Sequence, residues 1–303
     1  MTIKNMKGMI MHMKEILVKS SIDGSMQPSL FHKAVCSGRR PLLVGLHTWS
    51  ADRFNQERNM LPFAEELGWN LLLPEFRGPN LCSNPIGKEA CGSILAKQDI
   101  ADAVEYVLAN YEIDDKNIYL LGGSGGGHMA LLMAAYKPLL WKAVASFCPI
   151  TDLSKWYYEN PHYTPHIHYC CGGEPEGEHM EEYVKRSPVS YIDQIAKSNT
   201  KIFHGRYDKS VPFTHSLNLY YELSNKYPKA RVFLDIFDGG HELRLDDAKR
   251  WFLSQSDLLS GDMHVNGQDG NGQNGNKSGN RVDGDNKNDK GNDAGSNKYE
   301  LTK

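Results

Sequence analysis

Short apolar runs alternate with longer amphipathic stretches along most of the chain. The runs are apolar almost throughout, as is typical of strands buried on both faces of a parallel sheet; they lie at 41–49, 69–76, 117–123, 141–149, 200–205 and 230–237. The stretches between them carry apolar residues at helical spacing, at 57–67, 94–111, 127–136, 213–227 and 242–256. The alternation predicts an α/β fold with a mostly parallel central sheet and helices on both faces.

Two segments inside the domain depart from this alternation. Apolar segments at 15–21 and 29–35 flank a Gly-containing turn and predict an opening hairpin. Residues 152–189, rich in Trp, Tyr, His and Pro, separate two predicted strands. Because ligands of open α/β sheets bind at the carboxyl ends of the strands, we expect residues 152–189 to form a short cap over that end.

The two ends of the chain have a different composition. Residues 1–14 are methionine-rich and are interpreted as an untidy N-terminal leader. Residues 257–303 are mostly Gly, Asn, Asp and Lys, with almost nothing to bury, which predicts a disordered tail. The expected α/β domain therefore spans residues 15–256.

Composition restricts the classes of partner. Of the 303 residues, 40% are hydrophobic and 23% are charged, and the net charge is −3 with no basic block, which argues against nucleic acid or anionic membrane as main partner. No apolar run reaches the length of a membrane-spanning helix, and no signal peptide is recognisable. The six cysteines lack CxxC spacing, so we expect reduced thiols in a cytoplasmic protein; a Cys82–Cys91 bridge is the alternative for an exported one.

One serine lies in a run of glycines between a predicted strand and a predicted helix. The sequence Gly122-Gly123-Ser124-Gly125-Gly126 fits G-x-S-x-G, in which a serine nucleophile sits on a sharp strand-to-helix turn. Glycines around it remove side chains that would collide as the helix packs back on the strand, and the Gly125 N–H would face a developing oxyanion. The pattern alone also fits a glycine-rich turn or a phosphate-binding loop, but the helix start lacks the GK[ST] of a Walker loop.

A serine nucleophile needs a base, and the base needs a group that orients it. Asp208 and His241 each follow a later predicted strand, in the order Ser, Asp, His, so both should reach the edge that carries Ser124. The less favourably placed alternatives are Asp235, Asp238 and His204, the last interpreted as a structural residue at a strand end. The sequence therefore predicts a triad of Ser124, Asp208 and His241.

The second oxyanion donor should come from the loop after the strand at 41–49. Thr48 and Trp49 are the candidates, and Trp49 is favoured because it lies two residues beyond the strand-ending His47. The alternative is that Trp49 only packs in the wall of the pocket.

Taken together, these residues resemble the α/β-hydrolase superfamily. Ser124 in GGSGGG, Asp208 in HGRYDKSVP and His241 in GGHE are most similar to the catalytic domain of the prolyl oligopeptidase family of serine hydrolases. The sequence PEFRGPN at 74–80 is similar to an Arg-Gly loop of that family, and the likeness covers roughly residues 15–256. The resemblance implies two-step acyl transfer through the triad, with no cofactor and no metal.

Two departures from the family bear on the substrate. Peptidases of this family carry a large N-terminal propeller, for which there is no room before residue 41, and the loop HTWSADRF differs from their tyrosine-bearing oxyanion loop. We therefore expect a carboxylesterase that acts on a small-molecule or carbohydrate ester. The first alternative is an aminopeptidase or dipeptidase, which needs a carboxylate such as Glu159 to bind the substrate amine. The second is a non-catalytic binding protein.

The predicted cap supplies candidate pocket residues. Trp156, Tyr157 and Tyr158 could stack against a sugar or an aromatic acyl group. Arg77, Asp152 and Arg186 are expected to hold the cap down by ion pairs, or alternatively to clamp a substrate carboxylate. A metal site at His162, His166 and His168 is disfavoured because no matching carboxylate pattern accompanies them.

Overall fold

The computed structural model describes residues 13–256 and the backbone of residues 298–300. The leader predicted at 1–14 therefore lies almost entirely outside the described residues. Most of the tail predicted at 257–303 also lies outside them. Within that tail, strand β10 (Lys298–Glu300) pairs antiparallel with β9 (Glu242–Arg244).

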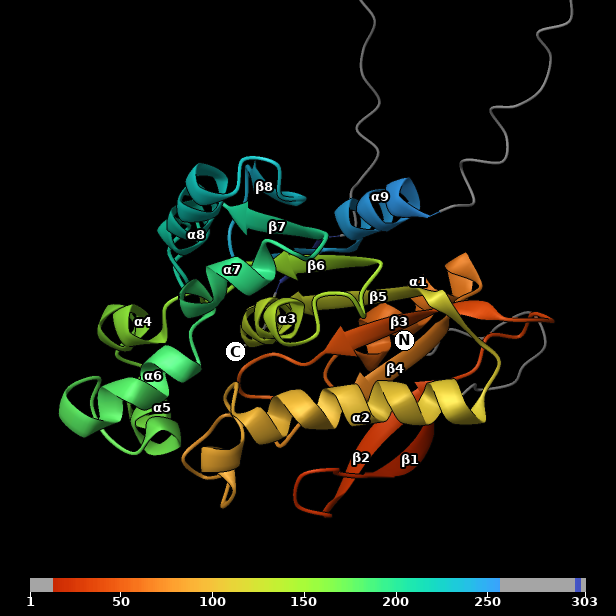
Figure 1. Cartoon of the computed structure of the whole chain (residues 1–303), viewed down its shortest axis with the longest axis horizontal. Coiled ribbons are helices and arrows are strands. Elements are labelled where there is room, and N and C mark those ends of the chain that lie inside the picture. The colour runs from red at the N-terminus through yellow and green to blue at the C-terminus, as the bar shows by residue number, and fades with distance from the viewer. Residues whose placement is uncertain (1–12, 257–297, 301–303) are drawn as a thin grey trace, which may run out of the picture.

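Eight strands of the described chain form one sheet, in the order β1-β2-β4-β3-β5-β6-β7-β8 (Figure 1). From β4 to β8 neighbouring strands are parallel, whereas β1 and β2 form an antiparallel hairpin and β2 is antiparallel to β4. The predicted mostly parallel sheet is thus confirmed, and so is the opening hairpin. The strands are β1 (Lys14–Lys19), β2 (Met26–His32), β3 (Arg40–Leu46), β4 (Asn70–Pro74), β5 (Ile113–Gly123), β6 (Ala143–Phe147), β7 (Thr200–Gly205) and β8 (Val232–Phe237).

Helices cover both faces of this sheet because its strands alternate their side chains between two apolar faces. Leu42 and Val44 of β3 pack with the helices on one face, and Leu43 packs with the helices on the other. The first face is covered by α2 (Ile94–Asn110), α3 (Gly125–Tyr136), α7 (Ile192–Ile195) and α8 (Thr214–Lys226), and the second by α1 (Glu57–Leu67) and α9 (Leu245–Gln255).

The predicted cap corresponds to a group of short helices between β6 and β7. It contains α4 (Leu153–Glu159), α5 (Thr164–Cys171) and α6 (Met180–Lys185), with the 3₁₀ turns η2 (Gly177–His179) and η3 (Pro188–Tyr191). The three α-helices lie together at the end of the sheet toward which the parallel strands point (Figure 1). A further 3₁₀ turn, η1 (Gly87–Glu89), contacts α5.

Arg186, directly after α6, attaches the cap to the domain, but through hydrogen bonds to backbone carbonyls instead of the predicted ion pairs. Its buried guanidinium donates hydrogen bonds to the carbonyls of Lys88, Ala90 and Cys91 and pairs with Glu182. Asp152 has a more local role than predicted, because its side chain caps α4 by accepting the Lys155 N–H.

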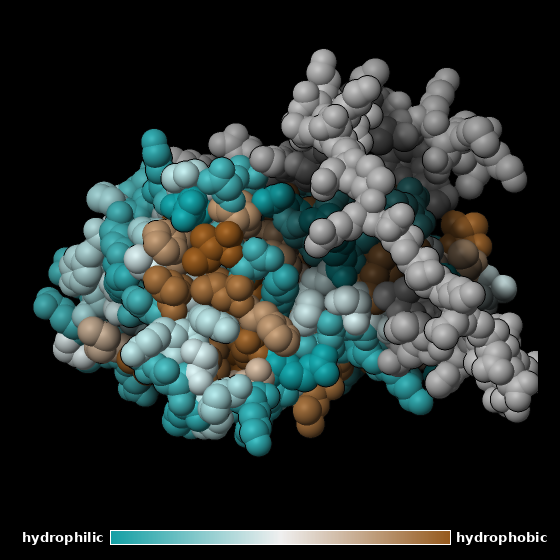
Figure 2. All heavy atoms as spheres, turned by 90° about the horizontal axis from the view of Figure 1, so that it is seen from above, coloured by the Kyte–Doolittle hydropathy of each residue, from teal (hydrophilic) through white to brown (hydrophobic). Residues whose placement is uncertain are grey.

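The far end of the sheet is formed by β8, which has a neighbour on one side only. Phe233 and Ile236 of this strand are both exposed, and apolar side chains gather on this side of the molecule (Figure 2). Among the residues that the structure describes, no helix combines the length and apolarity needed to cross a membrane.

Candidate active site

Ser124 occupies the turn between β5 and α3. Strand β5 ends at Gly123 and helix α3 begins at Gly125, which leaves Ser124 alone between them with φ 57° and ψ −122°. A positive φ is costly for a residue with a side chain, and it persists here because the Ser124 N–H donates to the carbonyl of Phe147 at 2.8 Å. This is the strained strand-to-helix geometry that presents a serine nucleophile.

The glycines around Ser124 are required by close backbone contacts. A Cβ at Gly122 would overlap with the carbonyl of Gly126, and a Cβ at Gly126 would lie 2.6 Å from the carbonyl oxygen of Leu46. The obstructing atoms belong to the backbone and cannot rotate away. The helix therefore packs against its own strand and against β3 only because these positions lack side chains.

Asp208 lies three residues beyond β7, with its carboxylate fully buried. One oxygen accepts the backbone N–H groups of Ser210 and Val211, at 2.8 and 2.9 Å. The other accepts the Nδ1–H of His241 at 2.6 Å. Burial alone would raise the pKa of Asp208, but the hydrogen bonds from His204, His241 and Val211 outweigh it and hold that pKa well below its usual range.

His241 comes from a glycine loop that is pressed against the end of β7. The N–H of Arg206 donates to the carbonyl of Phe237, and the N–H of Tyr207 donates to the carbonyl of Gly239. A Cβ at Gly205 would overlap with the carbonyl of Gly240, so the loops that carry Asp208 and His241 are in direct contact. The side chain of His241 is 13% exposed, which leaves it accessible from the cap side.

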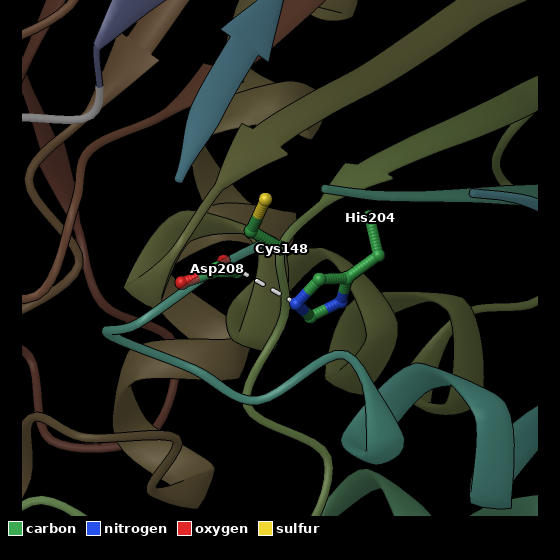
Figure 3. A group of neighbouring side chains, drawn as sticks. All are labelled: Cys148, His204 and Asp208. Carbon is green, nitrogen blue, oxygen red and sulfur yellow. Dashed lines mark ion pairs between the residues drawn. The ribbon is translucent and has the colours of Figure 1, made fainter. Parts of the chain in front are cut away.

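His204 and Cys148 lie beside the carboxylate of Asp208 (Figure 3). His204 Nε2 lies 2.9 Å from the carbonyl of Val211 and 3.3 Å from Asp208 Oδ2, while Nδ1 lies 2.7 Å from the Ser216 hydroxyl. Because a carbonyl can only accept, Nε2 carries the proton, and it points toward the carboxylate. His204 is therefore more than the strand-end residue that the sequence suggested.

Cys148, His204 and Asp208 lie close enough together to resemble a metal site. The protonated thiol of Cys148 argues against metal binding there. Burial raises the pKa of the Cys148 thiol well above its usual value, with the Asp208 charge adding to the effect. The thiol is directed at the carbonyls of Gly240 and Glu242, at 3.8 and 3.7 Å. Since metal ligands must be deprotonated, we interpret this group as a hydrogen-bonded support for Asp208.

Cys148 also connects the Ser124 turn to the loop that carries His241. Phe147 accepts the Ser124 N–H, and the thiol of the next residue, Cys148, contacts the carbonyls on both sides of His241. Within the described part of the chain, no hydrogen bond within 3.5 Å joins Ser124 to His241. Such contacts are often long in unliganded hydrolases and shorten when substrate binds.

The two backbone N–H groups of the oxyanion prediction belong to residues that lie next to each other at the Ser124 turn. Gly125 is the first residue of α3, where the N–H has no acceptor within the helix, and a Cβ at Gly125 would lie 2.5 Å from the backbone nitrogen of Trp49. The N–H of Thr48 donates to Asn55 Oδ1, which removes it from consideration. The pair next to Ser124 is thus formed by Gly125 and Trp49.

Comparison with known proteins gives the family. The sequence model of the prolyl oligopeptidase family matches residues 95–259, a span that includes Ser124, Asp208 and His241. The chain belongs to this family. The fold and the family are those of serine hydrolases.

Individual relatives agree with this membership. The acylamino-acid-releasing enzyme of Rattus norvegicus is 27% identical over 184 residues, which cover 56% of this chain and 24% of that protein. The inactive dipeptidyl peptidase 10 of Mus musculus is 30% identical over 128 residues, which cover 42% of this chain and 15% of that protein. The chain therefore spans about a quarter or less of the length of these curated relatives.

A solved structure gives the same fold. The acylaminoacyl peptidase of Pyrococcus horikoshii superimposes with a TM-score of 0.61 at 21% identity, over 76% of this chain and 37% of that one. The predicted α/β-hydrolase fold and the predicted resemblance to the prolyl oligopeptidase family are both confirmed.

Arg77, in the Arg-Gly segment at 74–80, has a structural role that differs from the one we predicted. The Arg77 side chain is 2% exposed, and its guanidinium binds the carboxylates of Asp23, Glu89 and Asp99 and the hydroxyls of Ser20 and Ser25. These bonds use all five N–H groups, so none is left for a substrate. All of these partners lie outside the cap, so Arg77 holds the β1–β2 turn against η1 and α2 instead of holding the cap down.

The same segment supports the oxyanion loop, and sequence reasoning missed this support. His47 stacks on Phe76 with ring centroids 3.8 Å apart, and its two ring nitrogens lie 2.8 Å from the carbonyls of Thr48 and Glu75. A Cβ at Gly78 would overlap with the His47 ring. These contacts fix the backbone just before Trp49. The only signal for them in the sequence was the likeness of PEFRGPN to the family.

The predicted aromatic pocket residues are mostly packed inside the cap. Trp156 is 1% exposed, lies 4.9 Å from Trp49 between ring centroids, and donates its indole N–H to the carbonyl of Ser210. Tyr157 is buried as well, whereas Tyr158 is 65% exposed. Trp156 thus links the cap to the oxyanion loop, and Tyr158 alone offers the open ring face predicted for all three.

Glu159 and two of the cap histidines already have hydrogen-bonding partners in the structure. Glu159 lies 2.8 Å from His215 Nε2 and 3.4 Å from Lys155 Nζ, so its carboxylate already has two partners. His166 Nδ1 accepts the Cys82 N–H, and His168 lies 3.5 Å from the Tyr157 hydroxyl. Cys82 is exposed and Cys91 is buried, and both are free thiols.

Proposed function

We propose that the protein is a serine peptidase that hydrolyses the amide bond after a blocked N-terminal residue of a short peptide. The observation that carries the proposal is the buried Asp208–His241 pair at 2.6 Å, on the same sheet edge as the Ser124 turn and the backbone N–H groups of Gly125 and Trp49. Together these supply the base, the nucleophile and the oxyanion donors of acyl transfer.

In this proposal each group has a defined role. Asp208 accepts Nδ1–H of His241, so Nε2 is left with its lone pair and takes the proton from Ser124 as Oγ attacks the carbonyl carbon. The N–H groups of Gly125 and Trp49 donate to the oxyanion. His241 returns the proton to the departing amine, and a water molecule, activated by the same histidine, then releases the acid from Ser124.

The choice of peptide over ester rests on the relatives. The carboxylesterase expected from the sequence uses the same chemistry, but the curated relatives are named acylamino-acid-releasing enzymes and the Pyrococcus horikoshii structure is named an acylaminoacyl peptidase, which favours the peptidase alternative. The choice of a blocked N-terminus rests on Glu159. An aminopeptidase needs a carboxylate for the substrate amine, and Glu159 is already paired with His215 and Lys155.

A panel of three substrates tests this proposal. We expect acetyl-Ala p-nitroanilide to be cleaved with a higher kcat/KM than Ala p-nitroanilide, and Ser124→Ala to abolish both activities. Ser190→Ala, which changes an exposed serine, is the matched control and should leave the rates unchanged. Preference for the free amine would support the aminopeptidase instead. Hydrolysis of p-nitrophenyl acetate with no anilide cleavage would restore the carboxylesterase.

A further inference from the structure

A cavity of about 200 Å³ lies at the junction of α2, α3 and the segment leading into α7. It is separate from the candidate active site. Tyr136, on its wall, lies twelve residues beyond Ser124, which corresponds to roughly 18 Å along α3 at the helical rise per residue. The cavity is lined by Lys97, Leu132, Ala135, Tyr136, Tyr191 and Gln194.

Lys97 is an unusual residue for such a wall. It is 8% exposed, and within the described residues its ammonium group has no carboxylate within 4.0 Å and no hydrogen-bond acceptor. The rings of Tyr191 and Tyr136 lie beside it, with centroids 5.5 and 5.8 Å from Nζ. A largely buried cation with no carboxylate at ion-pairing distance is costly to the empty protein, and a bound anion would reduce that cost.

The two tyrosine rings are held in place by their own hydroxyl groups. The Tyr136 hydroxyl donates to Gln98 Oε1 at 2.5 Å, and the Tyr191 hydroxyl donates to the carbonyl of Lys185 at 2.9 Å. Since these hydroxyls are engaged, the rings contribute flat apolar surfaces to the cavity. Leu132 and Ala135 are buried and add an apolar floor.

We propose that this cavity binds a small aromatic carboxylate. The carboxylate pairs with Lys97 Nζ, and the ring packs between Tyr136 and Tyr191 over Leu132. The size is suitable, because a cavity of about 150 Å³ is known to hold benzene, and the additional volume accommodates one carboxylate. The proposal does not depend on the activity proposed for Ser124.

Calorimetric titration of the full chain with benzoate tests the site, with neutral benzamide as the matched probe. We expect one benzoate per chain and at least tenfold weaker binding of benzamide. In the Lys97→Met protein we expect at least tenfold weaker benzoate binding, whereas Lys229→Met, at an exposed lysine, should bind as the wild type does. Equal binding of both probes, or unchanged benzoate binding in Lys97→Met, would overturn the proposal.

A second measurement needs no variant. The pKa of Lys97 is lowered to about 8, because burial and, to a smaller extent, the charge of Arg186 lower it while Glu182 opposes them. The other ionisable groups nearby include Tyr136 and Tyr191, whose pKa values burial raises. Asp102, Glu105 and Lys137 lie beside Tyr136, and Lys185 lies beside Tyr191. Benzoate affinity should therefore be constant below about pH 7 and fall up to about tenfold per unit above pH 8. Affinity that stays constant to pH 9.5 would contradict a role for Lys97.

Discussion

At the scale of single residues, Asp208 orients the histidine of the candidate site. Its carboxylate receives hydrogen bonds from two backbone N–H groups and faces two histidines, in a pocket closed to solvent. Asp208→Asn keeps the shape but presents an amide to His241 Nδ1. This imposes the wrong tautomer, so we expect kcat to fall about 10⁴-fold. Steady-state kinetics on acetyl-Ala p-nitroanilide checks this, and a loss below tenfold would contradict the role of Asp208.

The lowered pKa of Asp208 also predicts how stability depends on pH. Because the folded pKa lies below the unfolded value of about 3.9, ionised Asp208 stabilises the native state fully above that value, and the contribution decreases progressively as the pH falls below about 4 toward the folded pKa. Urea denaturation at pH 7 and pH 3 should therefore give a smaller stability difference between wild type and Asp208→Asn at the lower pH. An equal difference at both pH values would contradict the pKa shift.

The pairing of Asp208 with His241 could be anticipated from the sequence, whereas the contacts that support it could not. Asp208 and His241 could be found because each follows a predicted strand, and parallel strands bring their carboxyl ends to one edge. The support from His204 and Cys148 could not be found, because it depends on how side chains from β6 and β7 pack around the carboxylate. The pairing of Arg77 with Asp23 was also hidden, since it joins segments 54 residues apart.

At the scale of elements, the β5–α3 turn depends on contacts between backbones. Gly122→Ala would place its Cβ against the carbonyl of Gly126, where neither backbone can rotate away. We expect this change to lower the free energy of unfolding by about 3 kcal/mol or more. Gly240→Ala is the control, because a Cβ there meets open space, and its effect should stay under about 1 kcal/mol. Similar effects of the two changes in urea denaturation would contradict the packing argument.

The attachment of the cap depends on Arg186. Arg186→Met would leave the carbonyls of Lys88, Ala90 and Cys91 without their donor in a buried position, so we expect a loss of about 3 kcal/mol. Lys185→Met removes only an exposed lysine and should cost under about 1 kcal/mol. Thermal denaturation of both proteins measures the difference. If Arg186→Met melts at the temperature of Lys185→Met, the cap is held by other contacts.

Helix α2 illustrates the limit of periodicity arguments. Its apolar spacing predicted the helix itself, yet Ile94 is 52% exposed while Lys97 is buried. The reason is that α3 packs against α2 and Tyr191 of η3 lies over Lys97, and both come from segments far along the chain. Sequence patterns thus give the element, whereas the surroundings of its ends come from tertiary structure.

At the scale of the whole molecule, the order of strands explains why the site lies where it does. β3, β5, β7 and β8 carry the oxyanion loop, the Ser124 turn, Asp208 and His241, and all four strands point to the edge below the cap (Figure 1). The alternating apolar runs were sufficient to predict this arrangement. The surroundings of the candidate pocket residues were not predictable in the same way, because the partners of Trp156 and Glu159 are far along the chain and only the fold brings them together.

Covalent labelling tests directly whether Ser124 is the nucleophile of a working triad. Incubation with a fluorophosphonate, followed by mass spectrometry of the intact chain and its peptides, should give one adduct per molecule, located on Ser124. The adduct should be absent from Ser124→Ala and should form at least about 10³-fold more slowly in His241→Ala. A folded wild-type protein that remains unlabelled, or equal labelling of Ser124→Ala, would contradict the account.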